Sequence, residues 1–380
     1  MSGASDEVRL ARAALTRICE PASHGLAGLI EECGPVEALA RLRTGDPPPD
    51  ISRAVEARRG DDRARRDLDA IVALGGRLVC PEDDEWPVQL DELAAVSHLG
   101  DPVMPPVALW VRGPHPVAPA CARSVSIVGA RAASPYGTHV AGEFAYGLAE
   151  RGWTVVSGGA YGVDGSSHRG ALAAGGITVA VLASGVDRPY PLGHHSLFDR
   201  IGSDGLLISE WPPGCSPQRP RFLVRNRVIA ALSSGTVVVE AAARSGARLT
   251  ARRANELCRP LMAVPGPITS AMSVGVHQLI RSDGATLVTS AAEVIDLTGQ
   301  IGTDMVEPPR GPTTPRDALA PDVARVLEGM PTRKAAPAEE IAVHAGVRLS
   351  EALRALPLLV AHGLVEERGR GYRLTPAGRG

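Results

Sequence analysis

Short apolar runs alternate with helical patterns between about residues 124 and 297. Runs this rich in valine, isoleucine and leucine suit strands that are buried on both faces of a sheet. The helical stretches between them imply that neighbouring strands pair in parallel. The runs are SVSIVG, TVVSG, ITVAVLAS, GLLIS, TVVVEA, PLMAVPG and TLVTS. The pattern therefore predicts an α/β fold with a doubly wound, mostly parallel sheet.

A helical region precedes the sheet. Apolar residues recur with helical spacing over residues 5–45, and Gly34-Pro35 interrupts the pattern. The charged stretch 51–74 reads as one more helix, on the surface. We therefore expect a helical N-terminal domain at residues 1–75, followed by the sheet domain at 76–297.

The composition changes again after the sheet. Residues 298–318 are rich in proline and lack apolar periodicity, which is typical of a linker. Three helical patterns follow, and then a stretch that turns at residues 369–371, in the order of a winged helix. We expect a winged-helix module at 319–380, although Pro357 removes one backbone hydrogen bond inside its third helix.

Overall charge and cysteine content narrow the possible classes of protein. The formal net charge is −2, so any surface for a nucleic acid would have to be local. The six cysteines show no C-x-x-C pair and no zinc-ligand spacing, which fits a reducing compartment and no metal. No apolar run reaches about 18 residues, and the start of the chain does not resemble a signal peptide. We expect a cytoplasmic protein without membrane contact.

The first predicted strand ends in a glycine turn that leads into a helix. Gly129 makes the turn, Ser134 is a good N-cap, and Pro135 suits the first helical position. A helix N-terminus at this edge of a sheet suits an anion, and Arg131 could grip a phosphate through its planar guanidinium. The segment is neither G-x-G-x-x-G nor a P-loop, so we expect no nucleotide cofactor. An ordinary turn with a surface arginine is the alternative.

A second glycine-rich loop follows the next strand. Ser157 and Gly158 begin it, and its three glycines in five positions allow a ligand to approach the backbone closely. We expect Asp164 to cap the following helix rather than to act in catalysis. His168 has no assigned serine or cysteine nucleophile, so we expect it to be structural.

The richest basic segment begins at residue 219. Nine arginines stand against Glu240 and Glu256 between Arg219 and Arg259, a local balance of +7. Phe222 lies among these arginines rather than in an apolar run. An aromatic ring that stacks a base, flanked by cations on the backbone, is a common way to hold single-stranded nucleic acid. The alternative is that Phe222 fills the core while Arg225 and Arg227 pair with carboxylates.

Several motifs in one order resemble the DprA/Smf family over about residues 76–297. They are VGARAASPYG, SGGAYGVDGSSHRGAL, RNRVIAAL, EAAARSGARLTARRANEL and AVPGPITSAMSVGVHQLI. The resemblance implies a Rossmann-like protein that binds single-stranded DNA, protects incoming DNA during natural transformation and loads the recombinase RecA. It also implies a homodimer formed through the Rossmann domain, with no enzymatic activity and no cofactor.

The resemblance also suggests which residues contact DNA. They are Gly129, Arg131, Ser157, Gly158, Arg219, Phe222, Arg225, Asn226 and Arg227. Two positions depart from the family pattern. Tyr161 stands where a basic residue is common, and Leu223 replaces a proline after the phenylalanine.

Two other functions remain open. Gly235-Thr236 followed by Glu240 resembles the G-T-x-x-E motif of LOG-type nucleotide phosphoribohydrolases. The spacing between Thr236 and Glu240 is, however, one residue too long, and Ser233-Ser234 stands where that motif has two glycines. A winged-helix transcription factor with a ligand-sensing sheet is the other, and it rests on the C-terminal module alone.

Overall fold

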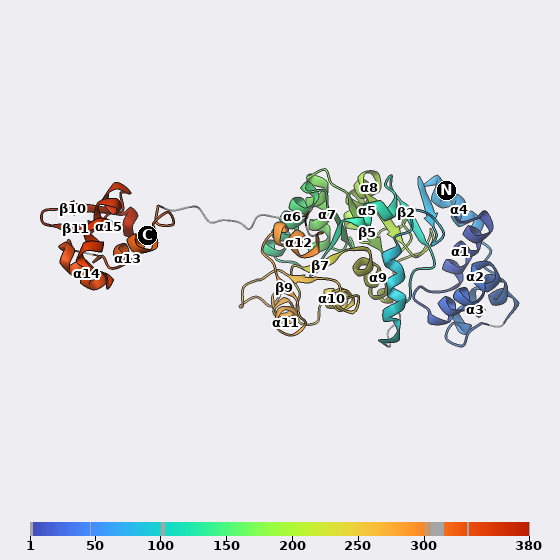
Figure 1. Cartoon of the computed structure of the whole chain (residues 1–380). Coiled ribbons are helices and arrows are strands. Elements are labelled where there is room, and N and C mark those ends of the chain that lie inside the picture. The colour runs from blue at the N-terminus through green and yellow to red at the C-terminus, as the bar shows by residue number, and fades with distance from the viewer. Residues whose placement is uncertain are drawn as a thin grey trace. The chain divides into compact units, whose positions relative to one another are not determined.

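The structure is a computed structural model that describes residues 3–45, 47–99, 103–300, 302, 304, 315–332 and 334–379. The chain divides into two compact units, Met1–Val306 and Glu307–Gly380 (Figure 1). Most of the predicted linker, residues 301, 303 and 305–314, lies outside the described residues. None of the described helices is both long and apolar enough to cross a membrane.

The larger unit is built on a nine-stranded sheet in its described part. In sheet order the strands are β1 (Gly76–Val79), β2 (Leu109–Arg112), β6 (Leu206–Ser209), β5 (Thr178–Leu182), β4 (Thr154–Ser157), β3 (Ser124–Val128), β7 (Gly235–Val238), β8 (Leu261–Ala263) and β9 (Thr286–Leu287). Strands β3 to β9 pair in parallel, whereas β1 and β2 add an antiparallel edge. The predicted α/β fold with a mostly parallel sheet is confirmed, and all seven predicted runs are strands.

Helices cover both faces of this sheet. They are α5 (Val117–Ala122), α6 (Pro135–Glu150), α7 (Val163–Ala173), α8 (His195–Asp204), α9 (Arg219–Leu232), α10 (Ala247–Glu256), α11 (Val274–Ser282) and α12 (Ala291–Thr298), with a 3-10 helix at Val88–Leu99. Successive residues of a strand point to opposite faces. Val125 and Ile127 of β3 therefore share a core with residues of α6, while Val128 shares one with residues of α9.

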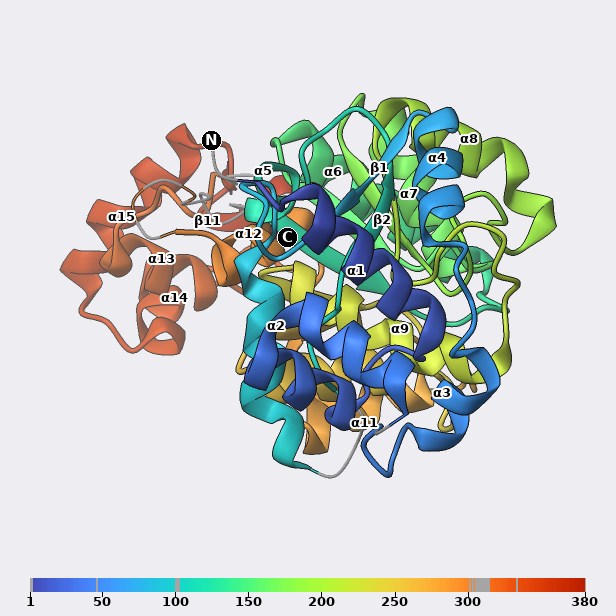
Figure 2. The ribbon, with the colours of Figure 1, turned by 90° about the vertical axis from the view of Figure 1, so that its right-hand side faces the viewer.

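The N-terminal helices belong to the same compact unit as the sheet. They are α1 (Asp6–Ile18), α2 (His24–Thr44), α3 (Ser52–Arg58) and α4 (Ala64–Ala73), and α1 contacts the other three (Figure 2). Their core continues into the sheet, because Leu15 and Leu42 cluster with Trp110 and Phe198. Residues 51–74 form two helices with a buried Asp67, so the expectation of one surface helix was wrong.

The smaller unit has three helices and a hairpin in its described part. They are α13 (Pro321–Glu328), α14 (Ala338–Ala345), α15 (Leu349–Ala361), β10 (Val365–Arg368) and β11 (Gly371–Leu374). Helix α15 continues through Pro357. The order of elements is the one expected, and the assignment to the winged-helix fold stays a prediction.

Candidate nucleic-acid interface

The candidate site lies where the strand order of the sheet reverses. The chain passes from β3 to β4 on one side, and β7 lies beside β3 on the other. Ligands of open α/β sheets bind outside the carboxyl ends of the strands at such a reversal. A cavity of about 280 Å³ lies there. Its lining includes Gly129, Arg131, Asp164, Phe222, Asn226, Ser245 and Thr250.

Helix α9 forms one wall of the cavity, and the residues predicted to contact DNA lie on two of its faces. Its α-helical period places Phe222 and Asn226 on one face, and both line the cavity. Arg219 begins the helix and is exposed. Arg221 and Arg225, four residues apart, are buried on the other face. The predicted segment is therefore a helix whose basic residues point in different directions.

Arg131 and Phe222 meet at the cavity. The guanidinium carbon of the exposed Arg131 lies 5.0 Å from the centre of the Phe222 ring, a cation–π contact. The exposed Tyr190 meets the same ring edge-on, with 5.8 Å between ring centres. Phe222 is half-buried and belongs to none of the described core clusters. This geometry does not support the alternative that Phe222 fills the core.

Two polar side chains of the cavity are available for a ligand. The buried Thr250 hydroxyl has no hydrogen-bond partner among the described residues. The oxygen of the Asn226 amide accepts a hydrogen bond from Arg225 Nε at 3.3 Å, whereas its amide nitrogen has no partner in the described part of the chain. Thr250 lies near the start of α10, where the helix dipole favours negative charge.

Arg225 is buried and holds the backbone around the site in place. Its Nη1 donates to the carbonyl of Gly158 at 2.8 Å and also to the carbonyl of Val181. Burial lowers its pKa to about 10, against the attraction of Asp164. A side chain at position 158 would clash with this guanidinium, which explains Gly158. Because Nη1 is taken up by these backbone carbonyls, we interpret Arg225 as a residue that shapes the site, and its contact with phosphate stays a prediction.

Arg227 is also held inside the protein. Its two terminal nitrogens donate to the two oxygens of Glu210, each at 2.6 Å, and Nε donates to the carbonyl of Met104 at 3.0 Å. Both side chains of this ion pair are almost fully buried. The expected phosphate contact of Arg227 is therefore corrected to a structural ion pair.

A carboxylate of the chain occupies the N-terminus of α6. Ser134 caps this helix as predicted and accepts a hydrogen bond from Gly137 N–H at 3.1 Å. Glu240, which follows β7, accepts hydrogen bonds from Ser134 N–H at 2.8 Å and from Ser134 Oγ at 2.6 Å. The buried Glu240 carboxylate takes up the Ser134 donors at this helix start, so the binding of an external anion here stays a prediction that depends on Arg131.

The second glycine loop is held by its own polar groups. Ser157 is buried and its Oγ donates to the carbonyl of Ile127 at 2.6 Å. Gly162, and not Asp164, is the N-cap of α7. Asp164 instead accepts a hydrogen bond from Ala160 N–H at 3.4 Å, and burial raises its pKa. Ser157 and Asp164 thus shape the loop beside the cavity.

Partners distant in sequence neutralise much of the basic segment. The pairs are Arg221–Glu20, Arg227–Glu210, Arg248–Asp283 and Arg259–Glu92. Arg219 and Arg244 have neither an ion pair nor a hydrogen bond among the described residues. Sequence reasoning missed Tyr190 beside the site, and the only signal for it is an aromatic residue in a proline-rich turn. The described residues contain no group of three or more His, Cys, Asp or Glu side chains that could hold a metal ion.

Comparisons with known proteins agree with these motifs. The family model of DNA recombination-mediator protein A matches residues 77–299. The chain is 46% identical over 379 residues to a putative DNA processing protein DprA of Mycobacterium tuberculosis, covering 99% of this chain and 96% of the relative.

Two solved structures show the same likeness in three dimensions. DNA processing protein A of Streptococcus pneumoniae superposes with a TM-score of 0.64 at 29% identity, covering 78% of this chain and 99% of that one. DNA processing protein A of Helicobacter pylori, whose structure is described for its single-stranded DNA binding mode, superposes with a TM-score of 0.50 at 27% identity. This likeness covers 59% of this chain and 96% of that one. The chain therefore belongs to the DprA/Smf family of DNA recombination-mediator proteins.

Proposed function

We propose that this protein binds single-stranded DNA at the cavity between the ends of β3 and β7. In this proposal it protects incoming DNA and passes it to a recombinase of the RecA kind. The contact between Arg131 and Phe222 carries the proposal, since it places a cation and an aromatic face together at a cavity. Single-strand binding proteins combine these two elements, with cations on phosphates and aromatic rings on bases.

The recessed position of Phe222 favours a single strand over a duplex. A base can stack on this half-buried ring only after it has left its neighbours, which costs a few kcal/mol in a duplex and least in a single strand. Contacts to phosphate and to an aromatic face carry no sequence information. We therefore expect little dependence on base sequence.

The phosphoribohydrolase alternative is less favoured by the geometry. The buried Gly235-Thr236 begins β7, whereas Glu240 follows the other end of that strand. The Glu240 carboxylate is held by Ser134 N–H and Oγ, and so it is not free to face a substrate. These positions support a binding protein rather than an enzyme.

The family supplies the rest of the proposal. It includes a cytoplasmic homodimer formed through the Rossmann domain and contact with RecA. Strand β9 supports such a dimer, because it ends the sheet and both of its residues are exposed. Sedimentation of the purified protein measures the oligomeric state, and a monomer at all concentrations would contradict the dimer.

The test of the central proposal compares a single-stranded oligonucleotide with a duplex of the same length by fluorescence anisotropy. We expect clearly tighter binding of the single strand, and a strong loss for Arg131→Ala. Arg66→Ala, which removes an exposed arginine from α4, is the control for a general loss of positive charge. Equal or tighter binding of the duplex would refute the proposal.

A further inference from the structure

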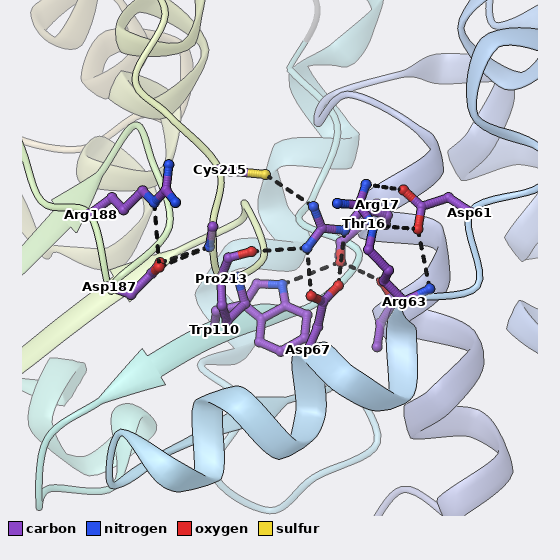
Figure 3. Close-up of polar contacts among 12 residues, drawn as sticks. Thr16, Arg17, Asp61, Arg63, Asp67, Trp110, Asp187, Arg188, Pro213 and Cys215 are labelled. Atoms are coloured by element: carbon purple, nitrogen blue, oxygen red, sulfur yellow. Dashed lines mark hydrogen bonds and ion pairs between the residues drawn. The ribbon is translucent and has the colours of Figure 1, made fainter.

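The segment that joins β6 to α9 is held from outside. Residues 211–218 form no helix or strand. Arg17 of α1 donates through Nη2 to the carbonyl of Pro213 at 2.9 Å, and the same guanidinium pairs with Asp67 at 2.6 Å (Figure 3). On the other side, Asp187 accepts a hydrogen bond from Gly214 N–H at 2.9 Å. The N-terminal helices therefore hold the entry to α9 in place.

Glu20 connects three parts of the chain. Its Oε1 lies 2.7 Å from Arg221 Nη2 and 3.1 Å from Arg58 Nη1, and its Oε2 accepts a hydrogen bond from Trp211 Nε1 at 3.0 Å. The guanidinium of Arg221 also lies over the Trp211 ring, 5.4 Å from its centre. Burial raises the pKa of Glu20, but the hydrogen bonds from Arg221 and Trp211 outweigh burial and hold the pKa below its usual range.

Arg221 lies in the first turn of α9, between two residues of the candidate site. Arg219 precedes it by two positions and Phe222 follows it directly. Each residue of an α-helix is rotated by a fixed angle from the one before. A contact that fixes Arg221 therefore also fixes the directions in which Arg219 and Phe222 point.

We propose that Glu20 is a positioning residue for DNA binding. It anchors the first turn of α9 so that Phe222 faces the cavity beside Arg131. The inference rests on the proposed function, because it assigns Glu20 a role at the same site. Glu20 makes its hydrogen bonds and ion pairs with Trp211, Arg221 and Arg58, none of which lines the cavity.

A second ion pair offers a matched control. Arg12 of α1 pairs with Glu82 at 2.6 Å, with side-chain exposures of 7% and 36%. The Arg221–Glu20 pair has exposures of 8% and 42% at 2.7 Å. Glu82→Ala therefore leaves an equally buried arginine without its carboxylate, yet the hydrogen bonds of this pair join Arg12 to Glu82 and to the carbonyl of Val107, and not to α9. Each variant removes the carboxylate from an ion pair with a buried arginine, but only Glu20→Ala removes a contact that holds α9.

The experiment measures the affinity of full-length variants for a single-stranded oligonucleotide that carries 2-aminopurine, whose fluorescence falls when the base stacks. We expect Glu20→Ala to bind about tenfold more weakly and to lose most of the quenching, within the range for one stacked base. The salt dependence should stay unchanged, because no phosphate contact is removed. Glu20→Gln keeps one acceptor oxygen, which can still receive a hydrogen bond from Arg221, so it should recover part of the affinity and keep the protein folded if Glu20→Ala does not fold.

The direction of the change separates positioning from simple electrostatics. Loss of a nearby carboxylate would by itself strengthen the attraction of an anionic strand. Unchanged or tighter binding by Glu20→Ala would overturn the proposal, as would an equal loss of affinity in Glu82→Ala. If the wild-type protein did not bind the oligonucleotide at all, the proposed function would fail and Glu20 would lose its assigned role with it.

Discussion

In the proposed complex, Arg131 and Phe222 bind the strand through two different physical interactions. A guanidinium on a phosphate acts by charge and displaces a counterion from the strand. A ring under a base acts by stacking and displaces none. The guanidinium carbon of Arg131 lies 5.0 Å from the centre of the Phe222 ring, so one nucleotide can contact both side chains. A salt titration then separates their contributions to the affinity.

The first prediction concerns these two residues. Phe222→Ala should weaken single-strand binding by about 1–3 kcal/mol and leave the salt dependence nearly unchanged. Arg131→Ala should lower the affinity and also flatten the log–log salt slope by about 0.7, the value for one phosphate contact on a single strand. Anisotropy titrations over a range of salt concentrations measure both. A change of slope in Phe222→Ala, or an unchanged slope in Arg131→Ala, would disprove this division.

His168 shows how burial fixes the protonation state of one residue. The Thr178 hydroxyl donates to the carbonyl of Val155 at 2.8 Å, so His168 Nδ1, at 2.7 Å from that hydroxyl, must be the donor to it. His168 Nε2 is then a buried acceptor without a partner among the described residues. Burial lowers the pKa of His168 to about 3.

This pKa predicts how stability depends on pH. In the unfolded chain His168 binds a proton near its ordinary pKa of 6.5, whereas the folded protein does not until about pH 3. The unfolded state therefore gains protons first, and stability should fall as the pH drops from 6.5 towards 3, by up to about 1.4 kcal/mol per pH unit.

Urea denaturation at several pH values, compared between the wild type and His168→Leu, isolates this effect. Asp164 acts in the opposite sense, because burial raises its pKa, but it is present in both proteins. Below pH 6.5 the unfolding free energy of the wild type should fall relative to that of His168→Leu. A constant difference would show that His168 is not buried in its neutral form.

Helix α9 shows that a count of charges along a sequence does not reveal which charged side chains are exposed and which are paired inside the protein. Nine arginines between residues 219 and 259 predict a basic surface. Arg221 and Arg227 are buried instead, and their partners Glu20 and Glu210 come from elsewhere in the chain. A local balance of charge contains no information on such partners. The exposed Arg219 and the cavity-facing Phe222 fit the prediction, whereas the sequence left open whether Arg225 and Arg227 contact phosphate or pair with carboxylates.

The buried pair of Arg227 and Glu210 gives a prediction for this helix. Arg227→Ala leaves a carboxylate unpaired in the interior, which costs about 3–5 kcal/mol of unfolding free energy. Replacement of both residues, as Arg227→Met with Glu210→Leu, should recover most of that loss, since no charge is left unpaired. Chemical denaturation measures both variants. A stable Arg227→Ala with weakened DNA binding would instead return Arg227 to the DNA-contact set.

The sheet itself could be predicted more fully than its surroundings. The parallel strands β3 to β8 are rich in apolar residues, because they are buried on both faces of the sheet. The antiparallel β1 and β2 were not predicted, and in β1 the residues Gly76 and Arg77 interrupt the apolar pattern that marks the other strands. Sequence pattern also cannot show that Leu15 and Leu42 share a core with Trp110, because this depends on how the N-terminal helices dock onto the sheet.

For the whole molecule, the smaller unit presents an apolar rather than a basic face. Leu349 and Leu353 of α15 lie one turn apart on the same side of the helix and are exposed, and so is Val360 two turns further along that side. Arg354 is the only Arg or Lys within α15. Helices that enter a DNA groove need side chains that hydrogen-bond phosphates and base edges. An exposed apolar helix face is instead typical of contacts with protein.

The last prediction follows from this difference between the two units. A chain that stops after Val306 keeps the whole larger unit, including the cavity and the N-terminal helices that hold α9. Its affinity for single-stranded DNA should stay within about tenfold of the full-length value, a limit of about 1.4 kcal/mol. Circular dichroism first confirms that the shortened protein is folded, and anisotropy then measures binding. A larger loss in a folded protein would make the C-terminal unit a main DNA-binding site, because that unit is all that the truncation removes.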